Sequence, residues 1–299
     1  MPEIFKSSPP MVSIGMPVFN GGRYIREALE SLLRQSHINF ELIISDNAST
    51  DNTANLCREF AARDARVRYV RQASNIGALG NFQYLLDQAT GQYFMWAACD
   101  DYWDDRWIET LLHVVQTGAV QAAFGRVLQV DGRSLPIEHI VNRQTFRYDE
   151  PLMWRRLKFF LDFEGCGKAN LFYSLFERKF MAELPIQSYG HDYHMIFDFL
   201  RRGCIAGTPS VVLHKRIHDD AASTLEINQE RGIGQKIFQR VLFPVDRKII
   251  AGYLKLASFS EVFLLLLATP VKYTIAYRHM FRRLRHALPH GSRKRPVNS

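Results

Sequence analysis

Two adjacent carboxylates, Asp100 and Asp101, follow directly on an apolar run from Tyr93 to Cys99. A run of this length, entered through a glycine and bounded by polar residues, is typical of a buried parallel strand. Open α/β sheets bind ligands at the carboxyl ends of such strands. Carboxylate oxygens there suit a hard divalent cation, Mg²⁺ or Mn²⁺, which would in turn hold phosphate oxygens. The alternative is a solvated acidic loop in which Asp101 or Asp104 caps the next helix.

Strands and helices alternate through the first 130 residues. Strands are expected at 11–19, 40–45, 67–70, 93–99 and 120–130, with helices at 24–35, 52–63, 78–89 and 106–115. Parallel neighbours need helical crossovers, so the pattern predicts an α/β fold with a doubly wound, mostly parallel central sheet and helices on both faces. Neither a G-x-G-x-x-G fingerprint nor a P-loop follows the first strand. We therefore expect polar side chains at the strand ends to hold the ligand.

The net charge of +8 is concentrated at the end of the chain. Residues 270–299 contain eight lysines and arginines and no acid, and removing these from the total of 38 leaves 30 bases against 30 acids in residues 1–269. A nucleic-acid-binding fold would need a basic face on its body. We therefore expect a neutral body with a basic tail, and no nucleic-acid partner.

The four cysteines are widely spaced and include no C-x-x-C pair. Their spacing argues against a zinc site and a disulfide framework, and it fits a reducing compartment. The first ten residues lack a basic segment followed by an apolar core, so no secretory signal is evident. Together these features predict a cytoplasmic protein.

Three segments occur in order along the first half of the chain. They read VSIGMPVFNGGRYIREALESLLRQS, FELIISDNASTDNT and SNIGALGNFQYLLDQATGQYFMWAACDD. Over residues 11–130 they resemble the nucleotide-sugar half of glycosyltransferase family 2, and the later GHDYH and RIH segments fit the same family. The resemblance implies a GT-A domain at 1–220, with a nucleotide-sugar-binding half at 11–130 and an acceptor and catalytic half at 131–220, followed by a helical extension at 221–299.

The resemblance also implies which residues bind the donor. Asp46 matches the carboxylate that hydrogen-bonds the nucleotide base, usually uracil, and Pro17 and Asn20 match the strand end that lines the base and ribose. The loop and helix start near the ribose and diphosphate are matched by Asn75, Gly77 and Asn81. Taken singly, these residues also suit plainer roles as turn formers, a backbone hinge and a solvated helix residue.

The acidic segment departs from the family pattern. The family commonly shows Asp-x-Asp-Asp, and here the first position is Ala98. Asp100 matches the main metal ligand, with Asp101 beside it, but the carboxylate that usually faces the ribose or assists the metal is missing. The implied cofactor is a divalent cation, and the strength of metal dependence stays open.

A second carboxylate with a catalytic pattern is Asp192. The apolar spacing after His191 predicts a helix that starts here, so Asp192 lies in its first turn. The plain reading is a capping residue that stabilises the helix by about 1 kcal/mol. The resemblance implies instead the catalytic Asp of the family's Glu-Asp pair, with His191 replacing the Glu. A helix N-terminus favours the ionised carboxylate that a general base needs.

Arg216 and His218 follow an apolar strand predicted at 210–213. They resemble the family's Arg-x-His segment near the diphosphate. Arg216 would neutralise phosphate charge on the leaving group, and His218 would be a further metal ligand. A histidine after a strand is also often merely exposed.

The C-terminal third mixes long apolar stretches with basic residues. Lys255, Glu261 and Lys272 interrupt the apolar run, so a membrane-spanning helix is not expected. A basic amphipathic segment suits the anionic inner face of a membrane. The alternative is a packed helical hairpin that closes the domain or forms a dimer.

These observations favour an inverting glycosyltransferase of bacterial surface polysaccharide or glycolipid assembly. Its expected donor is a nucleotide-diphosphate sugar, with a UDP-sugar favoured, and its expected acceptor is a saccharide or a lipid-linked saccharide. The rival class is a non-catalytic nucleotide-sugar-binding or assembly subunit, which the altered Ala98 and His191 positions make conceivable.

Overall fold

The computed structural model of the chain describes residues 11–181, 184, 191–218 and 245–287. Its centre is an eight-stranded sheet in the order β3-β2-β1-β4-β7-β6-β8-β5. The strands are β1 (Val12–Val18), β2 (Phe40–Asp46), β3 (Val67–Arg71), β4 (Tyr93–Trp96), β5 (Tyr102–Trp103), β6 (Ala122–Val130), β7 (Leu175–Glu177) and β8 (Ile205–Arg216). Four of the seven neighbouring pairs are parallel, which confirms the predicted α/β fold with a mostly parallel sheet.

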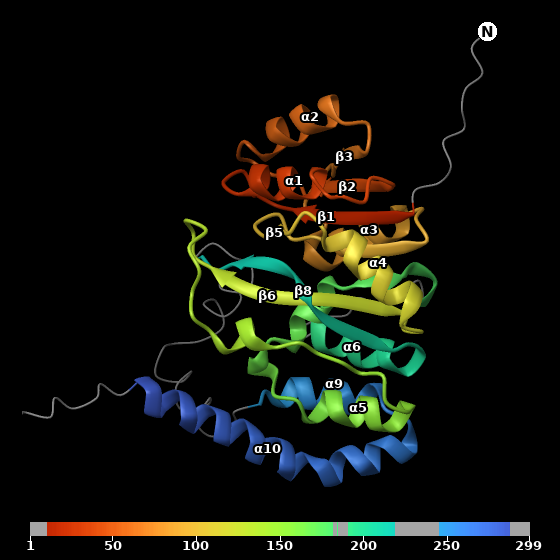
Figure 1. The fold of residues 1–299 in the computed structure, drawn as a ribbon, viewed down its shortest axis with the longest axis vertical. Helices are drawn as coiled ribbons and strands as arrows, with labels where there is room; N and C mark the ends of the chain where they lie inside the picture. Colours follow the sequence, from red (N-terminus) through yellow and green to blue (C-terminus); the bar gives the residue numbers. More distant parts are fainter. Residues whose placement is uncertain (1–10, 182–183, 185–190, 219–244, 288–299) are drawn as a thin grey trace, which may run out of the picture.

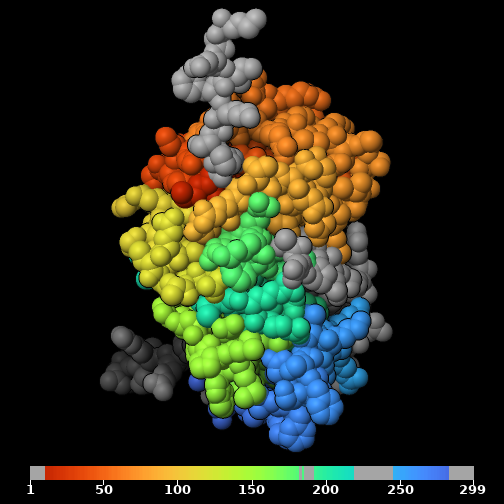
Figure 2. All heavy atoms as spheres, turned by 90° about the vertical axis from the view of Figure 1, so that its right-hand side faces the viewer, coloured from red at the N-terminus to blue at the C-terminus, as the bar shows by residue number. Residues whose placement is uncertain are grey.

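The helices form two groups, one around the sheet and one at an end of the molecule (Figure 1). The helices around the sheet are α1 (Ile25–Leu33), α2 (Thr53–Arg63), α3 (Gly77–Gln88), α4 (Trp107–Thr117) and α6 (His191–Arg202). At the far end from α2 lie α5 (Leu152–Leu161), α9 (Arg247–Leu256) and α10 (Phe259–Ala287). In the space-filling view the blue C-terminal helices form one end of the molecule and the orange N-terminal half the other (Figure 2).

Strand β1 shows why the sheet forms. All but one of its residues are buried, and successive residues of a strand point to opposite faces, so both faces of the sheet are covered here. Helix α3 packs on β1 and β2, and helix α4 packs on β6 and β8. Helix α1 buries Ile25, Ala28, Leu29 and Leu32, a stripe at helical spacing. Apolar periodicity therefore accounts for the core.

The carboxyl ends of β1, β2 and β4 meet at one edge of the sheet. The register pairs Val18 with Asp46 and Gly15 with Trp96. The loops that leave these strands are joined by hydrogen bonds from the Asn20 amide to Ser49 Oγ (2.9 Å) and from the Thr50 amide to Asn20 Oδ1 (2.8 Å). The two loops are thus held together where a ligand would bind.

Some predicted elements differ from the structure. Residues 168–173 form a 3₁₀ helix, η3 (Lys168–Tyr173), which is followed by the short β7. At its start, the buried ammonium of Lys168 donates to the carbonyls of Phe159 and Asp162. Strand β8 is longer than predicted, and β5 was not predicted. The predicted domain boundary at 220 lies outside the described residues.

The C-terminal helices pack as a layer against the body. Helix α10 lies along α5, and α9 lies against α6. By length and composition alone, Phe259–Arg282 of α10 could cross a membrane, with a mean hydropathy of 1.4 and 22% of its most apolar stretch buried. This differs from the expectation, which counted Glu261 and Lys272 as interruptions.

Candidate active site

A cavity of about 650 Å³ opens at the edge of the sheet where β1, β2 and β4 end. Its size is that of a pocket for a small organic ligand. Its wall brings together distant parts of the chain: Pro17–Gly21, Arg23, Tyr24, Asn47, Asn75, Ala78, Asn81, Phe82, Ala98–Asp101, Tyr173, Asp192 and Lys215–His218. Nine of the predicted site residues are in this wall, and two, Asp46 and Gly77, are not.

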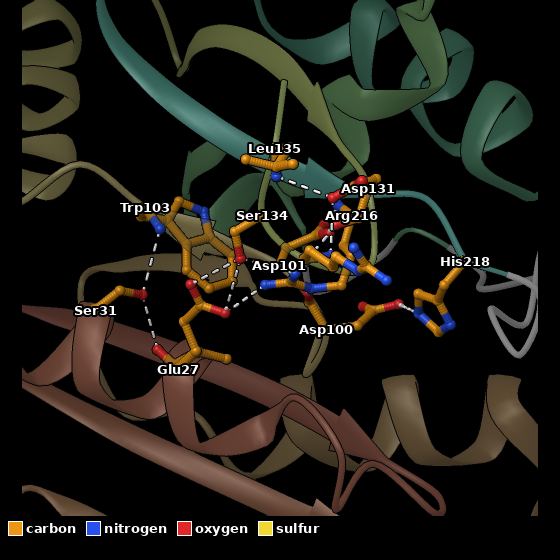
Figure 3. A network of polar contacts seen from close by, with 12 residues as sticks. Glu27, Ser31, Asp100, Asp101, Trp103, Asp131, Ser134, Leu135, Arg216 and His218 are labelled. Carbon is orange, nitrogen blue, oxygen red and sulfur yellow. Dashed lines mark hydrogen bonds and ion pairs between the residues drawn. The ribbon is translucent and has the colours of Figure 1, made fainter. Parts of the chain in front are cut away.

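Asp100 and His218 lie side by side in the cavity wall (Figure 3). His218 Nε2 is 3.0 Å from Asp100 Oδ2, and the imidazole ring packs against Tyr24 with 4.7 Å between ring centroids. The loop after β4 supplies the carboxylate, and the end of β8 supplies the imidazole. Two predicted metal ligands are therefore adjacent.

The side chain of Asp101 is directed into the protein, toward β8. It is 3% exposed, and its Oδ1 accepts a hydrogen bond from the Arg216 amide at 2.8 Å. Burial, and then the negative charge of Asp100, raise the pKa of the Asp101 carboxyl to about 8. Through this hydrogen bond Asp101 ties the β4 loop to β8. Its predicted role as a metal ligand stays a prediction.

The guanidinium of Arg216 is also directed into the protein. It donates to the carbonyl oxygens of Asp100 (2.9 Å) and Asp131 (3.2 Å) and to Ser134 Oγ (3.0 Å), and it pairs with Glu27. Figure 3 shows these partners around it. These bonds fix the position of Asp100 from the side of β8. The predicted contact of Arg216 with phosphate stays a prediction.

Lys215 is a cavity cation that the sequence reasoning passed over. Its ammonium donates to Asn170 Oδ1 at 2.8 Å and lies 5.3 Å from the centre of the Tyr173 ring. Its positive charge favours the ionised form of Asp101, so it lies close to the acidic pair. Arg216, the next residue of β8, also lines the cavity, but its guanidinium is bonded to Asp100, Asp131, Ser134 and Glu27.

Asp192 reaches the same cavity from another element. It lies in the first turn of α6 and is partly buried. Tyr173 connects it with the acidic pair: burial, followed by the charges of Asp192, Asp101 and Asp100, raises the pKa of the Tyr173 hydroxyl well above its usual value. Carboxylates 92 residues apart in the sequence, Asp100 and Asp192, therefore line one space.

Asp46 lies behind the cavity. It is fully buried, and its oxygens accept hydrogen bonds from the Ser49 amide (2.8 Å), the Tyr69 hydroxyl (2.8 Å) and Arg71 (2.9 Å). It fixes the turn in which Ala48 has a φ of +62°. Asn47 is the residue of this loop in the cavity wall, and the predicted contact of Asp46 with the nucleotide base stays a prediction.

The loop before α3 is shaped by Asn47. Its amide donates to Asn75 Oδ1 (2.9 Å) and to the Gly77 carbonyl (3.2 Å), and its oxygen accepts from the Ile76 amide (2.8 Å). Gly77 has a φ of +77°, a conformation that favours glycine, so it shapes the loop from outside the cavity wall. Asn81 is 2% exposed and pairs with Ser45 through both ends of its amide.

The residues of the wall offer two ligands for a divalent cation. Among the described residues, no three His, Cys, Asp or Glu side chains are grouped as a metal site. Asp100 and His218 alone fit part of one, because 3.0 Å is about the separation of neighbouring ligand atoms around an octahedral ion with bonds of about 2.1 Å. Mg²⁺ and Mn²⁺ sites of this kind are completed by substrate phosphates and water.

Comparisons with known proteins show the family and the fold of the chain. The sequence profile described as Glycosyl transferase family 2 matches residues 13–184. The chain is 31% identical over 140 residues to glycosyltransferase GlyG of Streptococcus pneumoniae serotype 4, a match that spans 47% of this chain and 46% of that relative. The chain thus spans about half the length of this relative.

Solved structures with the same fold include two with bound donors. S. aureus TarS (residues 1–349) in complex with UDP-GlcNAc has a TM-score of 0.56, with 16% identity over 92% of this chain and 91% of that one. The mannosyltransferase PcManGT from Pyrobaculum calidifontis, in complex with GDP-Man and Mn²⁺, has a TM-score of 0.54, with 16% identity over 92% and 84%. At these identities the likeness shows the fold, which is the one the resemblance predicted.

Proposed function

The chain belongs to glycosyltransferase family 2, and from this premise we propose that it transfers a sugar, with inversion, from a nucleotide-diphosphate sugar to an acceptor hydroxyl. The observation that carries the proposal is the shared cavity of Asp100 and Asp192. One carboxylate lies beside a potential metal ligand, and the other stands at the start of a helix. A single displacement needs this arrangement, with one group at the leaving phosphate and a base at the nucleophile.

Asp192 is the general base in this mechanism. Its carboxylate takes the proton from the acceptor hydroxyl as that oxygen forms a bond to the anomeric carbon of the donor. The bond from the anomeric carbon to the diphosphate oxygen breaks on the opposite face, and its electron pair leaves with the nucleoside diphosphate. The reaction therefore needs no enzyme nucleophile and inverts the anomeric centre.

Lys215 and Arg216 have different roles in this mechanism. Lys215 presents its charge to the cavity and offsets the negative charge that develops on the leaving diphosphate. Arg216 holds the backbone of Asp100 in place from below. Asp100 and His218 would hold a divalent cation, which, when bound, screens the charge of the diphosphate.

A UDP-sugar is the donor that we favour. The fold of TarS is known with UDP-GlcNAc bound, and the wall of this cavity carries the polar strand-end residues Asn20, Asn47 and Asn75 for a nucleotide. The acceptor is a saccharide or a lipid-linked saccharide of bacterial surface polysaccharide or glycolipid assembly. We place the protein in the cytoplasm, at the inner face of the membrane, in contact through its C-terminal helices.

Release of free nucleotide from a panel of nucleotide sugars, with Mg²⁺ or Mn²⁺ present, tests the proposal. Slow hydrolysis of one donor by the wild-type protein, reduced by chelation of the metal, is the expected result. Asp105→Asn is a control substitution that should hydrolyse the donor at the wild-type rate, because Asp105 is exposed and does not line the cavity. A protein that binds a donor but never releases nucleotide, with or without acceptor saccharides, would be a binding subunit and not a transferase.

A further inference from the structure

The first part of helix α10, residues 259–277, directs its charged side chains toward the body of the protein. Between Phe259 and Tyr277 it carries two charged residues, Glu261 and Lys272, and these are 8% and 1% exposed. Arg156 of α5 donates to both oxygens of Glu261, at 2.7 and 2.8 Å. Lys272 donates to Glu164 Oε1 at 2.7 Å. These two ion pairs, eleven residues apart on α10, fix which side of the helix faces inward.

The outward side of α10 is therefore apolar. The large apolar side chains exposed on it are Phe259 (97%), Phe263 (67%), Leu266 (53%), Leu267 (62%), Val271 (52%) and Phe281 (57%). Glu261, Leu265, Lys272 and Ala276 are buried on the other side, as expected for one stripe at helical spacing. In the described stretch 259–277, the solvent-facing side carries no charge at all.

The apolar surface continues at the start of α5. Arg156 Nη2 donates to the Leu256 carbonyl just before α10, so the beginnings of the two helices lie together. Leu152, Met153 and Trp154 at this point are 45%, 44% and 57% exposed. Figure 1 shows the two helices running side by side along the edge of the molecule farthest from α2.

Basic residues adjoin the other end of the stripe. Arg278 and Arg282 are exposed on α10, and residues 278–295 hold seven lysines and arginines with no acid. An apolar helix face of this size, next to a cluster of positive charge, is typical of a segment that lies in the interface of an anionic bilayer. A second copy that packed through the same stripe would bring the same exposed bases, Arg278 and Arg282, and no complementary charge from that stripe.

We propose that the outward face of α10 binds the surface of an anionic membrane, with the helix axis in the plane of the interface. The helix lies on the bilayer and does not span it, because Glu261 and Lys272 stay paired with Arg156 and Glu164. Spanning would separate these pairs and place two charges in hydrocarbon. The inference sharpens the membrane contact of the proposed function by naming the face and the lipid charge.

Co-sedimentation of the full chain with lipid vesicles tests this without donor or acceptor. Vesicles of phosphatidylglycerol with phosphatidylcholine are expected to bind the protein, and vesicles of phosphatidylcholine alone to bind it much less. Phe263→Glu with Leu267→Glu should weaken binding about tenfold or more, since two apolar side chains leave the interface and two negative charges enter. The matched control is Ile38→Glu with Leu135→Glu, two exposed apolar residues (74% and 59%) elsewhere on the surface, which should bind within about twofold of wild type.

A second variant separates charge from apolar contact. Arg278→Gln with Arg282→Gln should weaken binding roughly fivefold for each base removed, and added salt should have the same direction of effect. Three results would overturn the proposal: no binding of the wild type to anionic vesicles, retention after an alkaline carbonate wash, or a dimer that Phe263→Glu with Leu267→Glu converts to monomer. Vesicle binding is independent of turnover, so its failure would leave the proposed transferase activity standing.

Discussion

Arg216 at the cavity and Arg156 under helix α10 are almost equally buried, with 3% and 2% exposure. Each pairs with a glutamate from another element and donates to a backbone carbonyl. Their partners differ: Glu27 is half exposed, whereas the side chain of Glu261 is 11% exposed. Arg216 thus acts at the wall of the cavity, and Arg156 acts inside a buried contact between helices.

The comparison teaches that a buried arginine paired with a glutamate can support catalysis or the packing of a helix. The role depends on which segment the arginine fixes. Arg216 holds the loop of Asp100, so a change there moves a group that we assign to the donor phosphates. Arg156 fixes α10 on the body of the protein through Glu261, and it is not part of the cavity wall. Variants of the two arginines should therefore separate loss of activity from loss of stability.

Of the arginine and lysine variants considered, Arg216→Met should lower kcat/KM the most. It leaves the carbonyls of Asp100 and Asp131 without their side-chain donor, which should cost about 3 kcal/mol of unfolding free energy. The displaced Asp100 should lower kcat/KM roughly a thousandfold. Chemical denaturation and donor turnover measure the two effects, and Glu27→Gln is the milder control. Normal turnover in Arg216→Met would contradict the assigned positioning role.

Arg156→Met should reduce stability by about 3–5 kcal/mol, because it leaves the buried Glu261 carboxylate without its cationic partner and with donors from Ser258 only. The folded fraction should keep its kcat/KM within a few fold. The double variant Arg156→Met with Glu261→Met removes both charges and should regain much of the loss. Denaturant titration of the three proteins checks this. Equal stability of the single variant and the wild type would show that the pair does not hold α10.

Lys215→Met should lower kcat/KM by about 10- to 100-fold, since one positive charge no longer faces the leaving diphosphate. The stability should change by no more than about 1 kcal/mol, because the side chain lies at the cavity wall. Lys255→Met, an exposed lysine of α9, is the matched control and should leave turnover unchanged. If both lysine variants behave like the wild type, another group neutralises the diphosphate.

The buried lysines give the helical end its own pH dependence. Burial, and then the charge of Lys168, lower the pKa of the Lys272 ammonium to about 7, against 10.5 for an exposed lysine. Between pH 7 and about 10 the unfolded chain binds this proton more tightly, so the unfolding free energy should rise by about 1.4 kcal/mol per pH unit. Lys272→Met should flatten this rise. Denaturation at pH 7, 8 and 9 measures the slope, and an unchanged slope in the variant would contradict the assignment.

Much of the fold could be predicted from the sequence because its signals are local. Apolar runs such as 40–45 and stripes such as that of α1 depend only on spacing, and strand ends mark the edge of the sheet. The positions of Asp100 and Asp192 followed from ordered motifs. The sequence therefore predicted well where the strands and helices lie along the chain.

The directions of side chains could not be predicted in the same way. Asp101, Arg216 and Asp46 stand at the predicted edge, yet each is directed into the protein by partners from other elements. The ion-pair partner of Glu261, Arg156, lies 105 residues away on α5, so the local sequence does not reveal this ion pair. The direction of a charged side chain depends on such distant partners, and only the folded chain supplies them.

The central claim is that Asp192 is the general base of the transfer. Its most direct test is calorimetric titration of the intact donor, the nucleotide sugar that the wild type hydrolyses, into wild type and Asp192→Asn. Sugar transfer by both proteins is measured alongside. The substitution removes the base and keeps the size of the side chain, so it leaves Asp100, His218 and Lys215 in place. We predict donor affinity within about threefold of wild type, with transfer reduced roughly a thousandfold or more. Normal transfer by Asp192→Asn, or loss of donor binding equal to the loss of transfer, would contradict the account.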